Sequence, residues 1–303
     1  MRIFATGWSE NFDGPGRRWV IYLKGCNFKC QWCASPESMN QAPEMLFFPE
    51  RADQAEAACP RGAVTRSPAS AEDDGTWNID RKCCINCTNN FCTAVWQHPA
   101  FARMGQEMSI ADLVAAARKY RPLFGKDGGI TFGGGEPTLQ AQEVLLALDE
   151  LSKEKIHTAM ETNASSPFLS KFYNRVDLLI CDLKCVSRDL HKKWIGSDNQ
   201  QVLANLKQAA KQQKDLLIRI PFITGMNDND KEMQKIIDFL RELAKLRTSL
   251  AVQVLRLHHL GEPKYRALDR KYPMQNVPPP SKQQAQQFIK NMHQYGIDAT
   301  LGG

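Results

Sequence analysis

The stretch Gly25–Cys33 reads Gly-Cys-Asn-Phe-Lys-Cys-Gln-Trp-Cys and carries three thiols, Cys26, Cys30 and Cys33, at C-x3-C-x2-C spacing. Thiolates this close in sequence can converge on one soft metal centre, and clustered cysteines commonly hold an iron–sulfur cluster. Three ligands would leave one iron of a four-iron cluster open, and an open metal position can bind a substrate or cofactor. A zinc knuckle and three inert thiols are the alternatives that the spacing leaves open.

The composition is that of an ordinary globular protein. The 303 residues are 43% hydrophobic and 24% charged, and the net charge of +6 comes without a long run of Lys or Arg. We therefore expect no nucleic-acid partner, and no membrane span because no stretch approaches about 18 consecutive apolar residues. The N-terminus lacks the apolar core of a signal peptide, and ten cysteines in such a chain indicate metal ligation more than disulfides. We expect a cytoplasmic protein that works at low oxygen.

Strands and helices alternate on both sides of an irregular segment. Trp19–Leu23 is typical of a buried strand that leads into the cysteine loop, and regular alternation resumes at Met108. Such alternation implies parallel strands joined by right-handed crossovers. Because about six such units are too few for a full eight-fold barrel, we expect the α/β class, with a partial (β/α)6 barrel built from residues 1–34 and 107–303. Residues 35–106 contain frequent turn residues and five further cysteines, which we interpret as an inserted small cysteine-rich domain.

Chemically distinctive residues follow the predicted strands one after another. The carboxyl ends of parallel strands form one edge of a sheet, where such folds build their sites. We therefore expect these groups to join the cysteine loop in one site. Glycines allow an amino acid moiety to approach the backbone closely, and a neighbouring carboxylate can pair with an ammonium group. A plain turn and a solvated strand end are the alternatives for the glycine run and for Asp182–Lys184. The groups are Gly133–Glu136, Glu161-Thr162, Asp182–Lys184, Arg219 and His258.

The cysteine triad and the glycine run together resemble the signature of radical S-adenosylmethionine (SAM) enzymes. Further strings narrow the resemblance to the activating enzymes of glycyl radical enzymes, of the pyruvate formate-lyase activating enzyme type. They lie in the family's order through nearly the whole chain, although Glu161 stands where Asp is frequent and Leu257 replaces a Tyr. The strings are Asp13–Arg17 (DGPGR), Thr131–Gln140 (TFGGGEPTLQ), Glu161–Ala164 (ETNA), Asp177–Lys184 (DLLICDLK), Arg219–Asp228 (RIPFITGMND) and His258–Tyr265 (HHLGEPKY).

The resemblance implies an activity and its partners. A reduced cluster would cleave SAM to methionine and a 5′-deoxyadenosyl radical, which would abstract a hydrogen atom from a backbone glycine of a partner enzyme. The glycyl radical enzyme would bind transiently at the barrel mouth, beside Asp13–Arg17, and flavodoxin or ferredoxin would supply the electron. A radical SAM enzyme for a small molecule and a non-catalytic iron–sulfur protein are the alternatives. The sequence identifies neither the partner nor the oligomeric state.

By position, the resemblance also assigns the site residues. Cys26, Cys30 and Cys33 would be the catalytic cluster ligands. Glu161, Thr162 and Asp182, with the Ile180 carbonyl, would match a monovalent-cation site known in one branch. The residues assigned to SAM are Trp32, Gly134, Gly135, Glu136, Thr162, Asp182, Leu183, Lys184 and His258.

Many relatives carry a ferredoxin-like insert with two C-x2-C-x2-C-x3-C runs, and this chain retains part of each. The fourth cysteine of one run ligates the cluster of the other run, so Cys59 would join Cys84 and Cys87. We expect one auxiliary four-iron cluster completed by Cys92, with Cys83 as the substitute, and zinc on the same thiolates as the alternative. Its role, as an electron relay or in shaping the docking surface, stays open. The other ligand positions hold Pro49, Ala52, Ala55, Asn90 and Ala94.

Overall fold

The computed structural model describes residues 1–303 except 56–58, 69–74, 86, 88–91, 94–96 and 303. Within these residues the main sheet has nine strands, in the order β13-β12-β11-β10-β9-β8-β2-β1-β7. The strands are β1 (Arg2–Glu10), β2 (Arg17–Leu23), β7 (Gln106–Glu107), β8 (Gly129–Gly134), β9 (Thr158–Thr162), β10 (Leu178–Asp182), β11 (Asp215–Phe222), β12 (Ala251–Arg256) and β13 (Asp298–Gly302).

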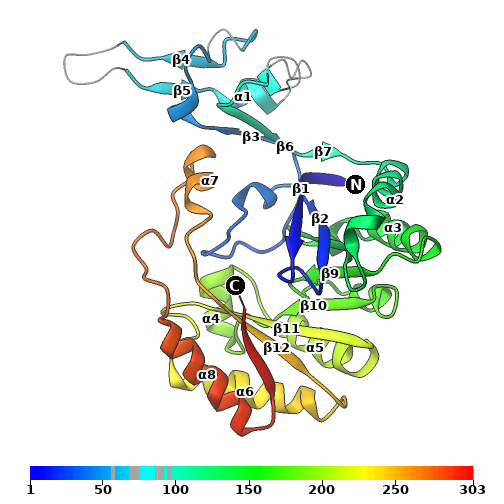
Figure 1. Ribbon diagram of the computed structural model, residues 1–303. Coiled ribbons are helices and arrows are strands. Elements are labelled where there is room, and N and C mark those ends of the chain that lie inside the picture. The colour runs from blue at the N-terminus through cyan, green and yellow to red at the C-terminus, as the bar shows by residue number, and fades with distance from the viewer. Residues whose placement is uncertain (56–58, 69–74, 86, 88–91, 94–96, 303) are drawn as a thin grey trace.

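All neighbouring strands from β2 to β13 pair in parallel, whereas β1 is antiparallel to both β2 and β7. Crossover helices cover the outer side of the curved sheet, as Figure 1 shows for α3, α5, α6 and α8. The predicted partial (β/α)6 barrel is therefore confirmed. The helices are α2 (Ile110–Phe124), α3 (Ala141–Lys153), α4 (Arg188–Ile195), α5 (Gln200–Gln212), α6 (Asp230–Ala244), α7 (Glu262–Ala267) and α8 (Lys282–Gln294), with 3₁₀ turns η4 (Pro137–Gln140) and η5 (Leu169–Phe172).

Helix caps and apolar stripes explain why these segments fold as they do. The Ser109 side chain accepts a hydrogen bond from the Asp112 amide and begins α2, as expected for an N-cap. Asn229 caps α6 in the same way, and α6 buries an apolar stripe against the sheet. Helix α2 continues past Pro122 to Phe124, whose side chain is buried in the core.

The described residues between Glu44 and Met104 form a small unit at one end of the barrel (Figure 1). β3 (Glu44–Phe47) pairs with β6 (Phe101–Met104), and β4 (Val64–Arg66) pairs with β5 (Trp77–Ile79). α1 (Arg81–Ile85) follows, while the 3₁₀ turns η1 (Pro36–Ser38) and η2 (Pro49–Arg51) flank β3. The unit has its own small core, which includes Met45, Phe47, Ala52, Ala55, Val64, Cys92, Ala100 and Phe101.

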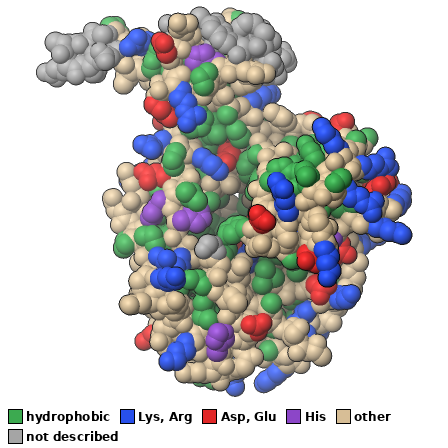
Figure 2. All heavy atoms as spheres, in the orientation of Figure 1, with side chains coloured by type: hydrophobic (Ala, Val, Ile, Leu, Met, Phe, Trp, Pro, Cys, Tyr) green, Lys and Arg blue, Asp and Glu red, His purple; other side chains and the backbone are tan. Residues whose placement is uncertain are grey.

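A second buried cluster joins the insert to the barrel. Leu46 of β3 packs with Ala267 and Leu268 at the end of α7. Figure 2 shows hydrophobic side chains gathered where the insert meets the barrel. The start of α7 lies against the cysteine loop. The approach is so close that a Cβ atom added to Gly261, the N-cap of α7, would lie 2.6 Å from the Cys33 carbonyl oxygen. Helix α7 therefore contacts both the insert and the cysteine loop. Among the described residues, no helix combines the length and apolar character that a membrane span needs.

Candidate active site

The cysteine loop leaves β2 and is held by backbone hydrogen bonds from two sides. The Cys26 amide donates to the Met39 carbonyl at 3.0 Å, and the Lys29 amide donates to the Ile195 carbonyl at 3.0 Å. The three thiols line one cavity of about 320 Å³. Burial raises the pKa of each to about 12. The free thiols therefore stay protonated near neutral pH, and ligation of a metal centre must release their protons.

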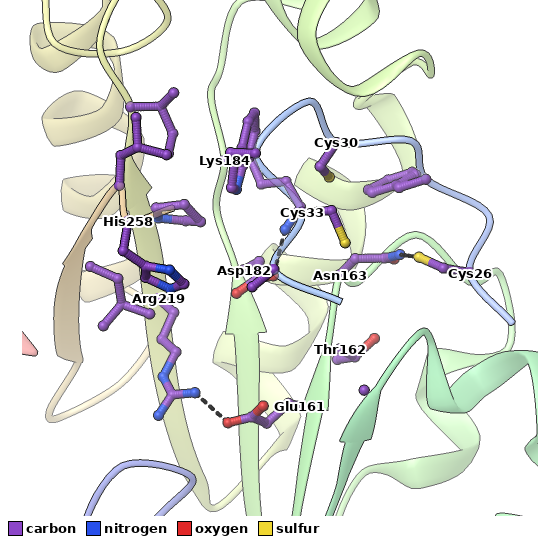
Figure 3. A pocket seen from close by; sticks show the side chains of 18 of the residues that line it. Cys26, Cys30, Cys33, Glu161, Thr162, Asn163, Asp182, Lys184, Arg219 and His258 are labelled. Atoms are coloured by element: carbon purple, nitrogen blue, oxygen red, sulfur yellow. Dashed lines mark hydrogen bonds and ion pairs between the residues drawn. The ribbon is translucent and has the colours of Figure 1, made fainter. Parts of the chain in front are cut away.

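The other walls of this cavity come from the carboxyl ends of successive strands, as the sequence predicted. Figure 3 shows the cysteines facing side chains from β9, β10, β11 and the end of β12. The predicted site residues that line the cavity are Cys26, Cys30, Trp32, Cys33, Gly134, Gly135, Glu161, Thr162, Asp182, Lys184, Arg219 and His258.

The glycine run brings the end of β8 against the cysteine loop. A Cβ atom on Gly135 would lie 2.1 Å from the Gly25 carbonyl oxygen, and Gly134 has a φ of +99°. Both positions therefore require glycine. The Gly135 amide donates to the Leu23 carbonyl at 2.8 Å, and the next amide donates to the Gly25 carbonyl at 2.8 Å. These contacts fix the position of the cysteine loop relative to the end of β8.

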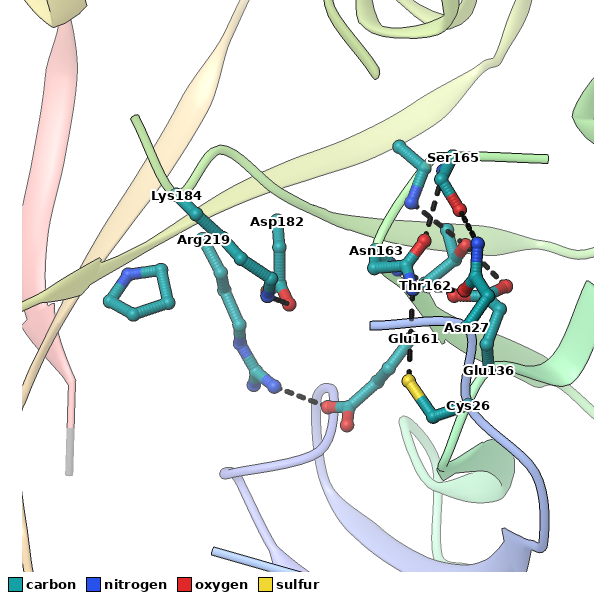
Figure 4. A network of polar contacts seen from close by, with 12 residues as sticks. Cys26, Asn27, Glu136, Glu161, Thr162, Asn163, Ser165, Asp182, Lys184 and Arg219 are labelled. Atoms are coloured by element: carbon teal, nitrogen blue, oxygen red, sulfur yellow. Dashed lines mark hydrogen bonds and ion pairs between the residues drawn. The ribbon is translucent and has the colours of Figure 1, made fainter. Parts of the chain in front are cut away.

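Glu136 does not lie where we expected an ammonium-binding carboxylate to lie. Its side chain is buried and is absent from the cavity wall. Its oxygens accept hydrogen bonds from the Thr138 hydroxyl at 2.6 Å, the Thr162 hydroxyl at 2.8 Å and the Asn163 amide at 2.8 Å (Figure 4). The carboxylate therefore joins the ends of β8 and β9. Leu183 also differs from the expectation, because its side chain is buried in the core and outside the cavity wall.

Lys184 and Asp182 form a close ion pair in the wall, with Nζ 2.5 Å from Oδ2. Burial alone would lower the pKa of Lys184, but its ion pair with Asp182 outweighs burial, so the net pKa is raised. The ammonium group is therefore charged at neutral pH and can bind a ligand carboxylate. Burial lowers the pKa of His258, and neighbouring His259 and Lys264 add to this shift. The His258 ring is therefore neutral at neutral pH.

Glu161 pairs with Arg219, a contact that the sequence did not predict. Burial raises the pKa of Glu161 to about 8; Arg219 opposes this shift, while Asp13 and Asp182 add to it. Both side-chain carboxylates expected to bind a monovalent cation thus have partners, Arg219 for Glu161 and Lys184 for Asp182. The residues as arranged here do not fit that cation.

Asn163 lines the cavity, although the sequence had given this residue no role of its own. Its side-chain nitrogen lies 3.9 Å from Cys26 Sγ and 3.0 Å from the Asn27 side-chain oxygen. Its position directly after Glu161-Thr162 at a strand end was a signal that could have found it. Apolar wall residues gave no comparable signal, because in sequence they look like core; they include Phe12, Phe28, Ile223 and Leu255.

The donor set fits the cofactors that the sequence implied. Three thiols face an open cavity, which suits a four-iron cluster with one iron left for a ligand. The cavity volume lies within the range of small-molecule sites, about 300–1,000 Å³. The charged Lys184 and the glycine backbone at Gly134-Gly135 border the same space and suit an amino acid moiety such as the methionyl end of SAM.

A second cavity, of about 20 Å³, is lined by the five cysteines of the insert. Burial raises the pKa of Cys84 to about 11, and the neighbouring Cys59, Cys92 and Cys87 add to this shift. Cys83 differs, because its Sγ lies 3.5 Å from Asp80 Oδ2 and this hydrogen bond is the main cause of its raised pKa. In the described part of the chain, no three Cys, His, Asp or Glu side chains are close enough to hold one metal ion. Asn90 and Ala94 lie outside the described residues.

Comparisons with known proteins agree with this geometry. The model of the radical SAM superfamily matches residues 77–240, and a model described as a 4Fe-4S single cluster domain matches residues 12–65. The chain is 33% identical over 269 residues to the 4-hydroxyphenylacetate decarboxylase activating enzyme of Clostridioides difficile (strain 630), covering 86% of this chain and 83% of the relative. It is 31% identical over 303 residues to the trans-4-hydroxy-L-proline dehydratase activating enzyme of Clostridioides difficile, covering 96% and 95%.

A solved structure has the same fold. The crystal structure of a radical SAM methyltransferase from Sphaerobacter thermophilus matches with a TM-score of 0.52 and 17% identity, covering 94% of this chain and 66% of that chain. The two relatives found by sequence identify a narrower family than the shared fold does, because the alignments cover most of each relative and most of this chain. This chain belongs to the activating enzymes of glycyl radical enzymes, within the radical SAM superfamily.

Proposed function

We propose that this protein activates one glycyl radical enzyme by using SAM to remove a hydrogen atom from a backbone glycine of that partner. The observation that carries the proposal is the cavity in which the three thiols of Cys26, Cys30 and Cys33 share walls with Lys184 and the glycine backbone at Gly135. Cys26, Cys30 and Cys33 would hold a four-iron cluster, which would supply the one electron needed to cleave the SAM sulfonium into methionine and a 5′-deoxyadenosyl radical. The remaining tasks belong to the chain itself.

The first task is to hold SAM in one orientation. The Lys184 ammonium would bind the methionyl carboxylate, and the backbone at Gly134-Gly135 leaves room for the amino end beside it. Trp32 and His258 border the same space and would contact the adenosyl part. Glu136 acts through position, because it fixes the ends of β8 and β9 without facing the cavity. Such fixed placement is the main contribution that a protein makes to cofactor chemistry.

The second task is to keep water from the radical. Phe12, Phe28, Ile223 and Leu255 give the cavity apolar walls, and a dry site prevents side reactions of a reactive intermediate. The turn at Asp13–Arg17 directly follows Phe12, which lines the cavity, and the Asp13 carbonyl accepts a hydrogen bond from the Thr131 hydroxyl at 2.7 Å. We propose that the glycine loop of the partner enters past this turn.

We further propose that residues 35–106 hold one auxiliary four-iron cluster on Cys59, Cys84, Cys87 and Cys92. Ala52 and Ala55, at ligand positions of the missing second cluster, are 1% and 0% exposed and fill the core of the insert. Zinc on the same four thiolates is the alternative.

Two of the relatives have different partners by name. Their names refer to 4-hydroxyphenylacetate decarboxylase and trans-4-hydroxy-L-proline dehydratase. We propose an enzyme of the same glycyl radical class as the partner, with flavodoxin or ferredoxin as electron donor. Because thiols that ligate clusters must stay reduced, we place the protein in the cytoplasm of an organism growing without oxygen.

Isotope transfer tests the proposal. A candidate glycyl radical enzyme is prepared with deuterated glycine and incubated without oxygen with the cluster-loaded protein, SAM and a reductant. We expect deuterium in the 5′-deoxyadenosine, because the radical takes its hydrogen atom from the glycine. Unlabelled 5′-deoxyadenosine formed together with turnover of a small molecule would instead support a radical SAM enzyme for a metabolite.

A further inference from the structure

Glu161 and Arg219 form their ion pair in the wall of the cavity, beside the paired Asp182 and Lys184 (Figure 3). Strand register places them there, because Ile180 of β10 is aligned with Glu161 and Asp182 of β10 is aligned with Arg219. Residues two apart on one strand share a face of the sheet. Glu161 and Arg219 therefore flank β10 on the same face, and the parallel strand register sets their pairing.

Arg219 is held from several directions. Its Nε donates to the Gln253 side-chain oxygen at 2.9 Å, and its Nη2 donates to the Phe12 carbonyl. Its guanidinium carbon lies 5.3 Å from the centre of the Phe12 ring, and its side chain is 5% exposed. A guanidinium whose three nitrogen atoms are all hydrogen-bonded keeps its permanent positive charge in a fixed place. The site thus carries a built-in cation next to the Glu161 carboxylate.

The two carboxylates that face this point already have cationic partners. Glu161 pairs with Arg219, and Asp182 pairs with Lys184. A metal cation would have to exchange its hydration water for oxygen atoms that are already engaged.

This inference rests on the proposed SAM site. We propose that the ion pairs Glu161–Arg219 and Asp182–Lys184 engage the carboxylate oxygens that a monovalent cation would need, so this protein binds SAM independently of Na⁺ and K⁺. The proposal depends on the length of the Glu161 side chain, which lets its carboxylate reach Arg219. A Glu161→Asp change would withdraw the carboxylate by one carbon–carbon bond, about 1.5 Å, and would free its oxygens from Arg219. That variant should regain a need for a cation.

SAM affinity in different salts tests the proposal on the cluster-loaded holoenzyme. Equilibrium dialysis with labelled SAM is run without oxygen in tetramethylammonium, sodium or potassium chloride at equal ionic strength. We expect the wild-type dissociation constant to change by less than about twofold, and that of Glu161→Asp to improve by about tenfold or more in K⁺ or Na⁺. Glu242→Asp, in an exposed pair with Lys207, is the matched control and should behave as wild type.

Two results would overturn the proposal. One is a wild-type SAM affinity that rises about tenfold with K⁺ or Na⁺; the other is a Glu161→Asp variant as indifferent to salt as wild type. Should the variant fail to fold, anomalous scattering from wild-type crystals grown with SAM and Rb⁺ decides instead. A peak beside Glu161 contradicts the proposal, and its absence supports it. Failure to bind SAM in every salt would refute the SAM site itself, so the two failures are distinguishable.

Discussion

The side-chain amide of Asn163 donates a hydrogen bond to Cys26 Sγ, at 3.9 Å. The amide is fixed in turn, because the same nitrogen lies 3.0 Å from the Asn27 side-chain oxygen and the Asn163 backbone amide is bound by Glu136. Hydrogen bonds to ligating sulfurs are among the factors that set the reduction potential of an iron–sulfur cluster. The end of β9 therefore touches a proposed cluster ligand directly.

Asn163→Ala should lower the reduction potential of the cluster on the cysteine triad. The reduced cluster carries more negative charge, so removal of a hydrogen-bond donor costs it more stabilisation than it costs the oxidised cluster. A bond of about 1 kcal/mol corresponds to a shift of about 40 mV for one electron. Redox titration followed by EPR measures the shift, with the exposed Asn78→Ala of the insert as control. An unchanged potential would show that this contact has no electrostatic role.

Gly135→Ala should abolish tight SAM binding while the protein still folds. The added Cβ would meet the Gly25 carbonyl oxygen at 2.1 Å, so the cysteine loop or the end of β8 must move. A displacement of this size is expected to weaken function by on the order of 10²-fold. Equilibrium dialysis with SAM measures the loss.

The control for that variant is Gly296→Ala. Gly296 also has a positive φ, +71°, but among the described residues no atom lies within 4 Å of the place that an added Cβ would take. The substitution should cost about 1–2 kcal/mol of stability and leave SAM binding intact. Equal SAM affinity in both variants would contradict the role given to Gly135.

Cys92→Ala and Cys83→Ala should differ in metal content. Cys92 is 9% exposed and belongs to the core of the insert beside Cys59 and Cys84, whereas Cys83 bonds to Asp80. We expect Cys83→Ala to retain about eight irons per chain and Cys92→Ala to retain about four, since each cluster holds four. Iron and zinc analysis of the anaerobically reconstituted proteins measures this. The reverse pattern would make Cys83 the fourth ligand.

Arg18→Met should destabilise the barrel and loosen the turn at Asp13–Arg17. The buried Arg18 guanidinium donates to the Thr131 hydroxyl at 2.6 Å, the Ile130 carbonyl at 2.7 Å and the Pro15 carbonyl at 3.3 Å. Loss of a buried charged partner commonly costs about 3–5 kcal/mol. Denaturant unfolding under argon measures the cost.

The neighbouring Arg17→Met is the matched control for Arg18→Met. Arg17 is exposed and stacks on Trp8, with its guanidinium carbon 5.2 Å from the ring centre. Its loss should cost less than about 1 kcal/mol, as for exposed cation–π contacts. Similar costs for the two variants would show that the buried network contributes little.

The sequence predicted the barrel and the strand ends that meet at the cysteine loop, because alternating strands and helices allow few arrangements. It did not predict that Glu136 turns inward. Two of the donors that bind Glu136 come from Thr162 and Asn163, more than twenty residues away at the end of β9, and only the folded sheet brings them to Glu136. The Glu161–Arg219 pair was hidden for the same reason, since it depends on the register of three strands.

Short elements were the other part that the sequence did not reveal. The strands of the insert have three or four residues, as β4 and β5 show, which is too short for a periodic pattern to stand out. The antiparallel β1 was also missed. Its alternation is weak, with intermediate exposure at many positions, and its pairing with β2 and β7 determines the strand.

The central claim is that this protein makes a glycyl radical in a partner enzyme. The most direct measurement is EPR spectroscopy of a candidate glycyl radical enzyme after anaerobic incubation with the cluster-loaded protein, SAM and reductant. We predict a glycyl doublet that requires all components and is absent when Cys30→Ala replaces the wild-type protein. Cleavage of SAM without a doublet in any glycyl radical enzyme from the same organism would contradict the account.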